Sequence, residues 1–562
     1  MSGVHSQASL APAYTPLDAQ REQIRLLHLL PGSWEDSVCC TTSIVDISEE
    51  PIFESLSYAW GDPSVTRAVF LNGHATPITV NLFAALRRLR YPNLRRCLWA
   101  DALCINQADL EEKSRQVSLM GKIYSGATRG LMWLGEYSER LSDLSQGTTH
   151  RNLLQSAMPE AKAVEAFDWM HRMAGNTDSP WDISHIDYEI TTRPEISTCV
   201  NSLQQFLSLP WWNRMWTLQE AVLPRDVSFI CGSSEITLGD MDRAQDNYNE
   251  HGITAVLPPY PEDHGSTIFV LDHLSVSVMV IAQLREVGDK RDIVHALLSC
   301  KDRRATNPRD KIYAVLGLFP QVAQLIDVDY GKDTSDISTE LLLCLIKLDG
   351  DLKALACVAT TPKDPSLPSW VPNWCYMQEN NMPGGEVNLL NEYHESYAAK
   401  LTKAQLHTPR HGVLSIRGLA VDRIVALQPV HATSSQAPPK AYAETFRDWI
   451  GSFTFASVQS TDEYLEIIGH MVDRMRILFH HNATIFITDQ GKLGYACYGL
   501  QINDMIHILF GGNVPFILRA AHQPLDPSRD QHYRLVCNCY VHGIMDGEAM
   551  EWGLQPQWTS LV

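Results

Sequence analysis

The sequence reads LSYAWG at 56–61, LWADALCINQ at 98–107 and WWNRMWTLQE at 211–220. Each of these segments crowds aromatic side chains, which usually pack in a core, against polar groups, which need hydrogen-bond partners. Each also falls where a predicted strand runs into a loop or a helix, which is where α/β folds bind their ligands. The three segments therefore predict one pocket, built from distant parts of a single domain.

Strands and helices are predicted to alternate around these segments. Predicted strands cover 24–30, 37–47, 53–60, 97–100, 130–135 and 227–231, and Asn72-Gly73 is predicted to turn a hairpin between 67 and 80. Predicted helices begin at Asn81 as an N-cap, run for about 17 residues from Asp109, and cover 161–174, 198–209 and 211–223. This alternation is typical of a parallel, flavodoxin-like sheet. We therefore expect an α/β domain at 23–240, after a disordered N-terminus at 1–22.

The helix after Asp109 is predicted to bury one face against the sheet. Apolar side chains recur along it at helical spacing, at Leu110, Val117, Met120 and Tyr124. The charged side chains are expected to lie outside, and they are Glu111, Glu112, Lys113 and Arg115. The stripe therefore predicts an amphipathic helix with a fully charged outer face.

The pattern changes beyond residue 240. Apolar helical segments dominate 241–365, and PRDK at 308–311 places a proline at a helix start with Asp310 in the first turn. Alternating apolar residues and glycine turns dominate 366–562. This part of the chain is predicted to be a helical region followed by a β-rich region.

Composition argues against a nucleic-acid partner. The chain has 562 residues, 45% of them hydrophobic, and a formal net charge of −20. Phosphate-rich partners bind to clustered Lys and Arg, which this balance does not favour. One basic cluster is interpreted as a solvated helix face in preference to a site for a phosphorylated ligand: Arg87, Arg88, Arg90, Arg95 and Arg96.

The sequence predicts a cytoplasmic protein with no membrane partner and no metal. No apolar run approaches the roughly 18 residues that cross a bilayer, and the N-terminus lacks a signal-peptide pattern. The 13 cysteines are scattered, which favours reduced thiols in the cytosol or nucleus. Cys537 and Cys539 lie near His532 and His542, but their spacing is not that of a CxxC knuckle, and the segment is typical of a strand.

The aromatic segments resemble the fungal heterokaryon-incompatibility (HET) domain family. The resemblance covers about residues 24–240, from FESLSYAWGD through WADALCINQ, a Gln-Val-x-x-Met helix and a WLG strand to WWNRMWTLQEAVLP. NPRDKIYAVLGL at 307–318 and LPSWVPNW at 367–374 resemble segments that often follow the domain in large members. One departure is Glu112-Lys113, where members commonly carry a Glu-Arg pair.

The resemblance implies a function in programmed cell death after the fusion of genetically different hyphae. It also implies a fold similar to the Toll/interleukin-1 receptor (TIR) domain, which is a flavodoxin-like sheet. Some TIR-like domains cleave NAD with one glutamate on a helix after a Trp-containing motif, and Glu220 is the matching position. The resemblance therefore makes this chain a candidate NAD glycohydrolase, with NAD as the substrate and no cofactor.

The residue types around Glu220 suit this chemistry. The ribose passes through an oxocarbenium-like state and nicotinamide leaves as a neutral base, so one carboxylate suffices. In a continuous helix Trp216 lies four residues earlier on the same face, where its indole suits a cationic pyridinium ring. The alternative is that Glu220 forms a structural salt bridge with Arg214 or with another arginine.

Five further residues are candidates for contacts with the nucleotide. Tyr58, Trp60 and Asp62 end one predicted strand, and Asp101 and Asn106 follow the next. Asp62 is a candidate for a ribose hydroxyl, although we favour a turn. Asp101 and Asn106 either contact the ligand or bind backbone amides of their own loop, which is the commoner use of these residues.

Two hypotheses about function remain open. The first is an effector that hydrolyses NAD, and the second is a non-enzymatic module that self-associates or binds an allelic protein partner, which the aromatic content also suits. Glycine-rich dinucleotide and P-loop motifs do not occur in the sequence.

Cys104 has no evident histidine partner and is expected to be a packed thiol. Three tryptophans are expected in the core: Trp99, Trp133 and Trp211.

Overall fold

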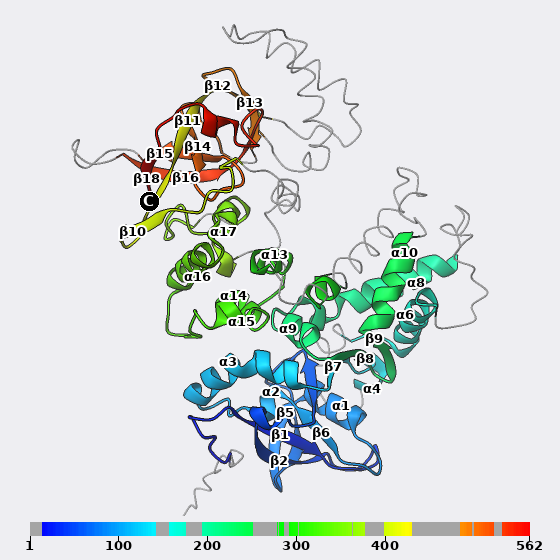
Figure 1. The fold of residues 1–562 in the computed structure, drawn as a ribbon. Coiled ribbons are helices and arrows are strands. Elements are labelled where there is room, and N and C mark those ends of the chain that lie inside the picture. The colour runs from blue at the N-terminus through cyan, green and yellow to red at the C-terminus, as the bar shows by residue number, and fades with distance from the viewer. Residues whose placement is uncertain are drawn as a thin grey trace, which may run out of the picture. The chain divides into compact units, whose positions relative to one another are not determined.

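The computed structural model forms two compact units, Met1–Tyr330 and Gly331–Val562, and each is described here by itself (Figure 1). The described residues are 14–141, 157–175, 194–250, 278, 280–285, 292–301, 303–361, 364–376, 398–429, 484–496, 499–521 and 531–562. The first 13 positions of the predicted disordered N-terminus lie outside them. The predicted domain boundaries at 240 and 365 stay predictions.

A mixed sheet frames the first unit. Its strands are β1 (Gln23–Leu29), β2 (Cys39–Asp46), β3 (Glu54–Tyr58), β4 (Thr66–Leu71), β5 (His74–Thr79), β6 (Arg96–Trp99), β7 (Arg129–Gly135), β8 (Asp226–Cys231) and β9 (Ser234–Thr237), in the order β5-β4-β2-β1-β6-β3-β7-β8-β9. The neighbours β6, β3, β7 and β8 run parallel. In chain order these four are the second, first, third and fourth strands. The predicted α/β architecture is confirmed, but the sheet is mixed and not parallel throughout, because β1–β2, β1–β6, β4–β5 and β8–β9 pair antiparallel.

Helices connect and cover these strands. Those described in the first unit are η1 (Ile47–Glu49), α1 (Val80–Leu89), α2 (Asp101–Cys104), α3 (Leu110–Gly126), α4 (Ser138–Leu141), α6 (Glu160–Met173), α8 (Pro194–Ser208), η3 (Pro210–Asn213), α9 (Thr217–Val222), α10 (Leu238–Glu250), α13 (Ile293–Ser299), α14 (Asp310–Leu316) and α15 (Pro320–Ala323). Trp99, Trp133 and Trp211 are fully buried, as predicted. The core therefore lies between the central strands and the helices that contact them.

Two local sequence signals are confirmed. Asn72 and Gly73 have φ values of 51° and 83° between β4 and β5, as the Asn-Gly pair predicts. Asp109 caps α3 by accepting hydrogen bonds from the backbone amides of Glu111 and Glu112, and α3 has 17 residues. Both signals depend on neighbouring residues alone, which is why the sequence is sufficient to find them.

The prediction that Asn81 caps α1 is wrong, because α1 begins one residue earlier. The Asn81 amide donates instead to the Ala59 carbonyl at 2.6 Å and accepts from the Trp133 indole at 2.9 Å. Asn81 therefore joins the end of β3 to β7. Its partners come from other strands, which spacing along the chain does not reveal.

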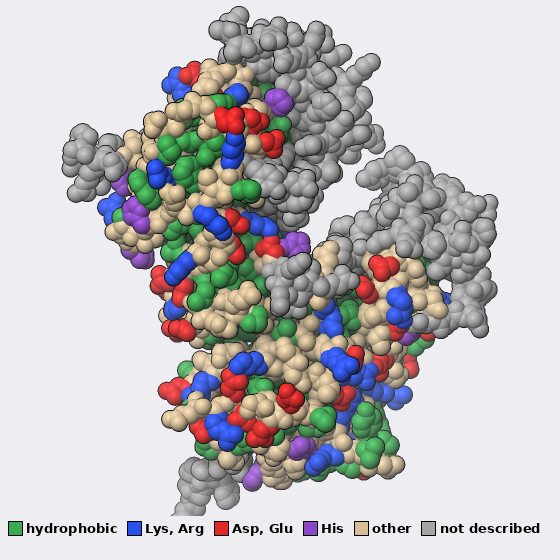
Figure 2. Space-filling view, viewed as in Figure 1, with side chains coloured by type: hydrophobic (Ala, Val, Ile, Leu, Met, Phe, Trp, Pro, Cys, Tyr) green, Lys and Arg blue, Asp and Glu red, His purple; other side chains and the backbone are tan. Residues whose placement is uncertain are grey.

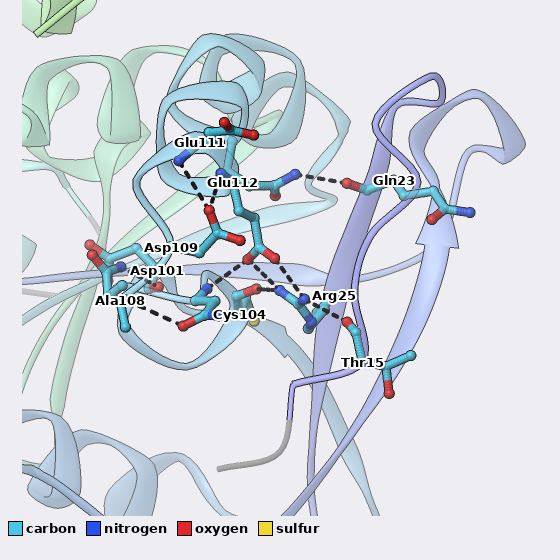
Figure 3. Close-up of polar contacts among 12 residues, drawn as sticks. Thr15, Gln23, Arg25, Asp101, Cys104, Ala108, Asp109, Glu111 and Glu112 are labelled. Carbon is cyan, nitrogen blue, oxygen red and sulfur yellow. Dashed lines mark hydrogen bonds and ion pairs between the residues drawn. The ribbon is translucent and has the colours of Figure 1, made fainter. Parts of the chain in front are cut away.

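The predicted orientation of α3 is also wrong at two positions, one in the apolar stripe and one on the charged outer face. Leu110 is 76% exposed, whereas Glu112 is buried. Arg25 of β1 binds Glu112 through Nη1–Oε1 at 2.6 Å and Nη2–Oε2 at 2.9 Å. Figure 3 shows this pair, with the Cys104 and Thr15 carbonyls as further acceptors for the guanidinium. Helical spacing could not predict the burial, because the partner lies 87 positions earlier in the chain.

The predicted helix at 211–223 is interrupted. Its residues form η3 and α9, separated by a loop. In that loop the Met215 amide donates to the Arg304 carbonyl at 2.9 Å, and the Arg304 amide donates to the Asn213 carbonyl. Backbone groups that pair with another segment are not available for helical hydrogen bonds. The interruption therefore comes from a distant part of the chain.

The second unit combines helices with a β-rich sheet, as predicted. Its helices are α16 (Thr334–Asp349), α17 (Lys353–Ala356), η5 (Cys357–Thr360), η6 (Trp374–Tyr376) and η7 (Glu548–Glu551). Its strands are β10 (Leu406–Arg410), β11 (Val413–Pro429), β12 (Thr484–Thr488), β13 (Leu493–Ala496), β14 (Met505–Leu509), β15 (Phe516–Ala520), β16 (His532–Asn538), β17 (Tyr540–Val541) and β18 (Gln557–Leu561). The long strand β11 pairs with β10, β12, β14 and β18. It is therefore the strand on which the sheet is organised.

Charged side chains of both signs are interspersed on the face of the first unit that Figure 2 draws. The interpretation of the basic cluster as a solvated face is wrong for two of its five arginines, whereas Arg95 is exposed. Arg90 and Arg96 are buried, Arg96 binds Glu54 at 2.5 and 2.8 Å, and Arg88 pairs with Glu136 at 2.7 Å.

Among the described residues, helices of the length and apolarity needed to span a bilayer are absent.

Candidate functional site

The carboxyl ends of β3 and β6 bring three of the predicted residues together. Tyr58 ends β3, Trp60 follows it, and Asp101 begins α2 just after β6. Asp101 Oδ1 accepts from the Tyr58 hydroxyl at 2.9 Å and from the backbone amide of Ala102 at 2.7 Å, and its Oδ2 accepts from the Trp60 indole at 2.8 Å. The carboxylate thereby orients both rings, and Trp60 remains 37% exposed.

Asp62 and Asn106 are used within their own turns. Asp62 Oδ1 accepts from the Ser64 amide at 2.8 Å and from the Ser64 hydroxyl at 2.6 Å, and these bonds lower the pKa of Asp62. Asn106 Oδ1 accepts from the Ala108 amide at 3.3 Å. Both side chains therefore have local backbone partners, the alternative that the sequence left open, and their contact with a ligand stays a prediction.

Glu220 lies on α9, which contacts β3 and β7. The side chain is buried, with 4% of the residue exposed. The Ser57 hydroxyl of β3 donates to Glu220 Oε2 and accepts from the Trp211 indole at 2.7 Å. Tyr124 of α3 makes a further hydrogen bond to the carboxyl group. Three elements that are distant in sequence therefore converge on one acid.

The environment of Glu220 raises its pKa from 4.5 to about 7. Burial is the main cause, and the charge of Asp101 adds to it. The positive charge of Arg214 and the hydrogen bonds from Ser57 and Tyr124 oppose the rise. A carboxyl group that titrates near neutral pH is typical of catalytic acids and bases, although buried structural networks also perturb pKa values.

Arg214 acts on Glu220 through its charge rather than through a hydrogen bond. Its guanidinium donates instead to the Tyr58 carbonyl at the end of β3. Arg214 is half-buried in the loop before α9, and its charge also reaches Asp310 of α14. The alternative of a direct salt bridge between Arg214 and Glu220 is therefore replaced by a guanidinium that hydrogen-bonds the Tyr58 carbonyl and acts by its charge on Glu220 and Asp310.

Trp216 occupies the N-cap position of α9 in a helical conformation, and its carbonyl accepts from the Glu220 amide at 3.5 Å. The two residues are therefore one helical turn apart, as predicted. The Trp216 indole hydrogen-bonds the Asp310 carboxylate, and the side chain is half-buried. Stacking of this indole on a nicotinamide ring stays a prediction.

The sequence pattern does not assign three side chains of this cluster to the site. Ser57 lies inside an apolar strand, Tyr124 belongs to an apolar stripe, and Asp310 carries a charge at a helix start. A polar residue in a strand that is buried on both faces is a signal for Ser57, since it needs a partner. The other two have no comparable signal, because their partners lie far away in the sequence.

Nucleophilic chemistry at Cys104 is not supported. The thiol is fully buried, and burial raises its pKa to about 12. A thiol with such a pKa is not a thiolate at neutral pH, so Cys104 is a packed core residue, as predicted. Within the described ranges, groups of three or more His, Cys, Asp or Glu side chains arranged to hold a metal ion do not occur.

Comparison with known proteins supports a heterokaryon incompatibility protein. Residues 53–220 match the family described as heterokaryon incompatibility protein (HET), and residues 460–554 match the Het-6 beta-barrel domain. The chain is 23% identical to heterokaryon incompatibility protein 6, OR allele, of Neurospora crassa, over 93% of this chain and 94% of that protein. This relative is consistent with a fungal source. No solved structure matches the chain.

Proposed function

We propose that this chain is an effector of heterokaryon incompatibility whose first unit cleaves NAD at the nicotinamide–ribose bond, with Glu220 as the reacting carboxylate. Loss of NAD from the cytoplasm then kills the fused cell. The observation that carries the proposal is the environment of Glu220, where burial raises the pKa to about 7 and so poises the group between its two protonation states. The similarity to the Neurospora protein supports the incompatibility function.

The topology of the sheet supports the TIR-like part of the proposal. Flavodoxin-like sheets place their parallel strands in the order 2-1-3-4-5, and β6-β3-β7-β8 follow the first four places of that order. In such sheets the ligand crevice opens where the order reverses, between the first and third strands. These strands are β3 and β7, and α9 contacts both of them.

The proposed reaction uses one carboxylate and water. The bond between the ribose C1′ and the nicotinamide nitrogen breaks, and its electron pair neutralises the pyridinium ring. Ionised Glu220 stabilises or traps the cationic ribose, and water then bonds to C1′ and loses a proton. Tyr58, Trp60, Asp62, Asp101, Asn106 and Trp216 are the proposed contacts with the nucleotide. The products are nicotinamide and ADP-ribose, and no cofactor is consumed.

A second function is favoured by the same burial. Glu220 is 4% exposed and takes hydrogen bonds from Ser57 and Tyr124, which is how a structural acid is satisfied. In this alternative the first unit is an interaction module that self-associates or binds an allelic protein partner. An enzyme requires that ligand binding expose the buried Glu220 carboxylate to the substrate, whereas an interaction module requires that this carboxylate stay buried.

An NAD assay on the purified full-length chain separates the two functions. We expect the wild-type chain to convert NAD to nicotinamide, and Glu220→Gln to abolish the conversion while keeping the fold. Glu111→Gln is the matched control, because this glutamate lies on the exposed side of α3 with 89% of its side chain accessible. The interaction module would remain as the function if neither the wild-type chain nor Glu220→Gln consumes NAD and if cells that express Glu220→Gln still die.

A further inference from the structure

Residues 303–330 lie beyond the matched region 53–220 but belong to the same compact unit. Their backbone is joined to the loop that precedes α9. The Met215 amide donates to the Arg304 carbonyl at 2.9 Å, and the Arg304 amide donates back to the Asn213 carbonyl. This reciprocal pair fixes the chain just ahead of the helix that carries the candidate carboxylate.

A buried side chain strengthens the same junction. Arg303 is buried, and its Nη1 donates to the Thr217 hydroxyl at 3.0 Å and to the Arg214 carbonyl at 3.3 Å. The helix α9 has six residues, and Trp216 at its N-cap makes no side-chain cap hydrogen bond. A helix this short is not stable without tertiary contacts. Segment 303–330 supplies several of them.

The helix of this segment, α14, approaches α3 with almost no room between the two backbones. A Cβ at Gly121 of α3 would lie 2.9 Å from the Gly317 carbonyl oxygen and 3.1 Å from its Cα. Gly317, at the end of α14, also has the Gln219 amide of α9 beside it. Glycine at both positions permits this approach. As a result α14 lies against α9, which carries Glu220, and its C-terminal end at Gly317 lies against α3, which carries Tyr124.

From this position α14 brings Asp310 to the loop before α9. The residue is 9% exposed, and its carboxylate accepts from the Tyr330 hydroxyl at 2.8 Å and takes a hydrogen bond from Trp216. The cations that face it are Lys113 from α3 and Arg214 from the loop. Burial raises the pKa of Asp310, and the hydrogen bonds and cations oppose the rise.

We propose that Asp310 is a positioning residue of the candidate site, which holds the Trp216 indole in place at the start of α9. The functional unit then extends through Tyr330 and does not end with the matched region. The role in NAD turnover rests on the proposed function of Glu220. The role in fixing Trp216 does not, and it is tested separately.

The first test follows the fluorescence of Trp216 in the full-length chain. Glu220→Gln is the background, because it removes the titration of the nearby acid. The emission of Trp216 is isolated by subtracting the spectrum of the same chain with Trp216→Phe. We expect this emission to titrate with a midpoint above 3.8, the ordinary pKa of aspartate, and the titration to vanish in Asp310→Asn.

The matched control is Asp327→Asn, an exposed aspartate of the same segment, which should leave the titration unchanged. The proposal is overturned if the Trp216 emission titrates with the same midpoint and amplitude whether or not Asp310→Asn is added to the Glu220→Gln background. Tyr330→Phe covers the case in which Asp310→Asn does not fold. It removes one donor that lowers the pKa of Asp310, so the midpoint should move to higher pH. A midpoint that does not move overturns the proposal as well.

The second test measures NAD turnover in the wild-type background. We expect Asp310→Asn and Tyr330→Phe to raise KM for NAD about tenfold, the equivalent of one lost hydrogen bond. Asp327→Asn should leave KM unchanged. Unchanged KM in both site variants overturns the role in turnover. A wild-type chain that leaves NAD intact instead defeats the proposed function, while the Trp216 titration still decides whether Asp310 positions the indole.

Discussion

Replacing Glu220 with glutamine should change how the stability of the first unit depends on pH. Burial raises the pKa of Glu220 from 4.5 to about 7, so the folded state keeps a proton that the unfolded chain releases near pH 4.5. The resulting stabilisation is complete below pH 4.5 and is lost as the pH rises through about 7. At about 1.4 kcal/mol for each pH unit, the loss is about 3 kcal/mol. Glutamine keeps the size of the side chain but has no proton to lose.

Urea unfolding at several pH values measures this effect. The free energy of unfolding is obtained from tryptophan fluorescence for wild type and Glu220→Gln at each pH between 4.5 and 8.5. The difference between the two chains at one pH cancels the groups they share. Wild type should lose about 3 kcal/mol relative to Glu220→Gln across this range. If the free energies of unfolding of wild type and Glu220→Gln ran parallel across the pH range, the raised pKa of Glu220 would be refuted. Glu111→Gln is the control, and its profile should run parallel to that of wild type.

The same group sets the expected pH dependence of the proposed activity. Only ionised Glu220 stabilises a cationic ribose, so kcat/KM should rise with pH and level off above about 7, the pKa of this carboxyl group. A profile that is flat between pH 5 and pH 8, together with measurable NAD loss, would assign the activity to another residue.

Three further predictions test the surroundings of the site. Ser57→Ala removes a hydrogen bond that lowers the pKa of the reacting carboxyl group, so the midpoint of the activity profile should move to higher pH, and a fixed midpoint would contradict that bond. Glu112→Gln should lower the free energy of unfolding by about 3 to 5 kcal/mol, because it leaves the buried Arg25 guanidinium without a counter-charge, whereas the exposed Glu111→Gln should cost less than about 1 kcal/mol. Equal urea midpoints for these two chains would argue against the buried pair. Gly121→Ala should lower Tm, because its methyl group meets backbone at 2.9 Å, whereas Gly126→Ala on the same helix meets nothing within 4 Å and should be neutral or stabilising. The opposite order of Tm values would mean that the two helices are not in close approach.

The parallel centre of the sheet was predictable because its signals are local. Alternating strands and helices, the Asn72-Gly73 turn and the Asp109 cap each depend on neighbouring residues. The three aromatic segments also meet, since Tyr58 and Trp60 share Asp101, and Ser57 contacts Trp211 and Glu220, whereas the pocket expected between them stays a prediction. This much of the fold and of the candidate site can be predicted without coordinates.

The remaining features depend on partners that periodicity does not encode. Glu112 is buried because Arg25 meets it from another strand, although its helical position predicts an exposed side chain. The helix at 211–223 is interrupted because Arg304 pairs with its backbone. Asp310 belongs to a segment that the sequence assigned to a different region. In each case tertiary pairing overrides a local preference, and one sequence does not reveal which distant segment supplies the partner.

The hydrogen bonds at Ser57 have a direction. An indole nitrogen can donate but cannot accept, so Trp211 must donate to the Ser57 hydroxyl, which in turn donates to Glu220. A proton released by the carboxyl group therefore has no path through this side, because the relay ends at a ring with no basic atom.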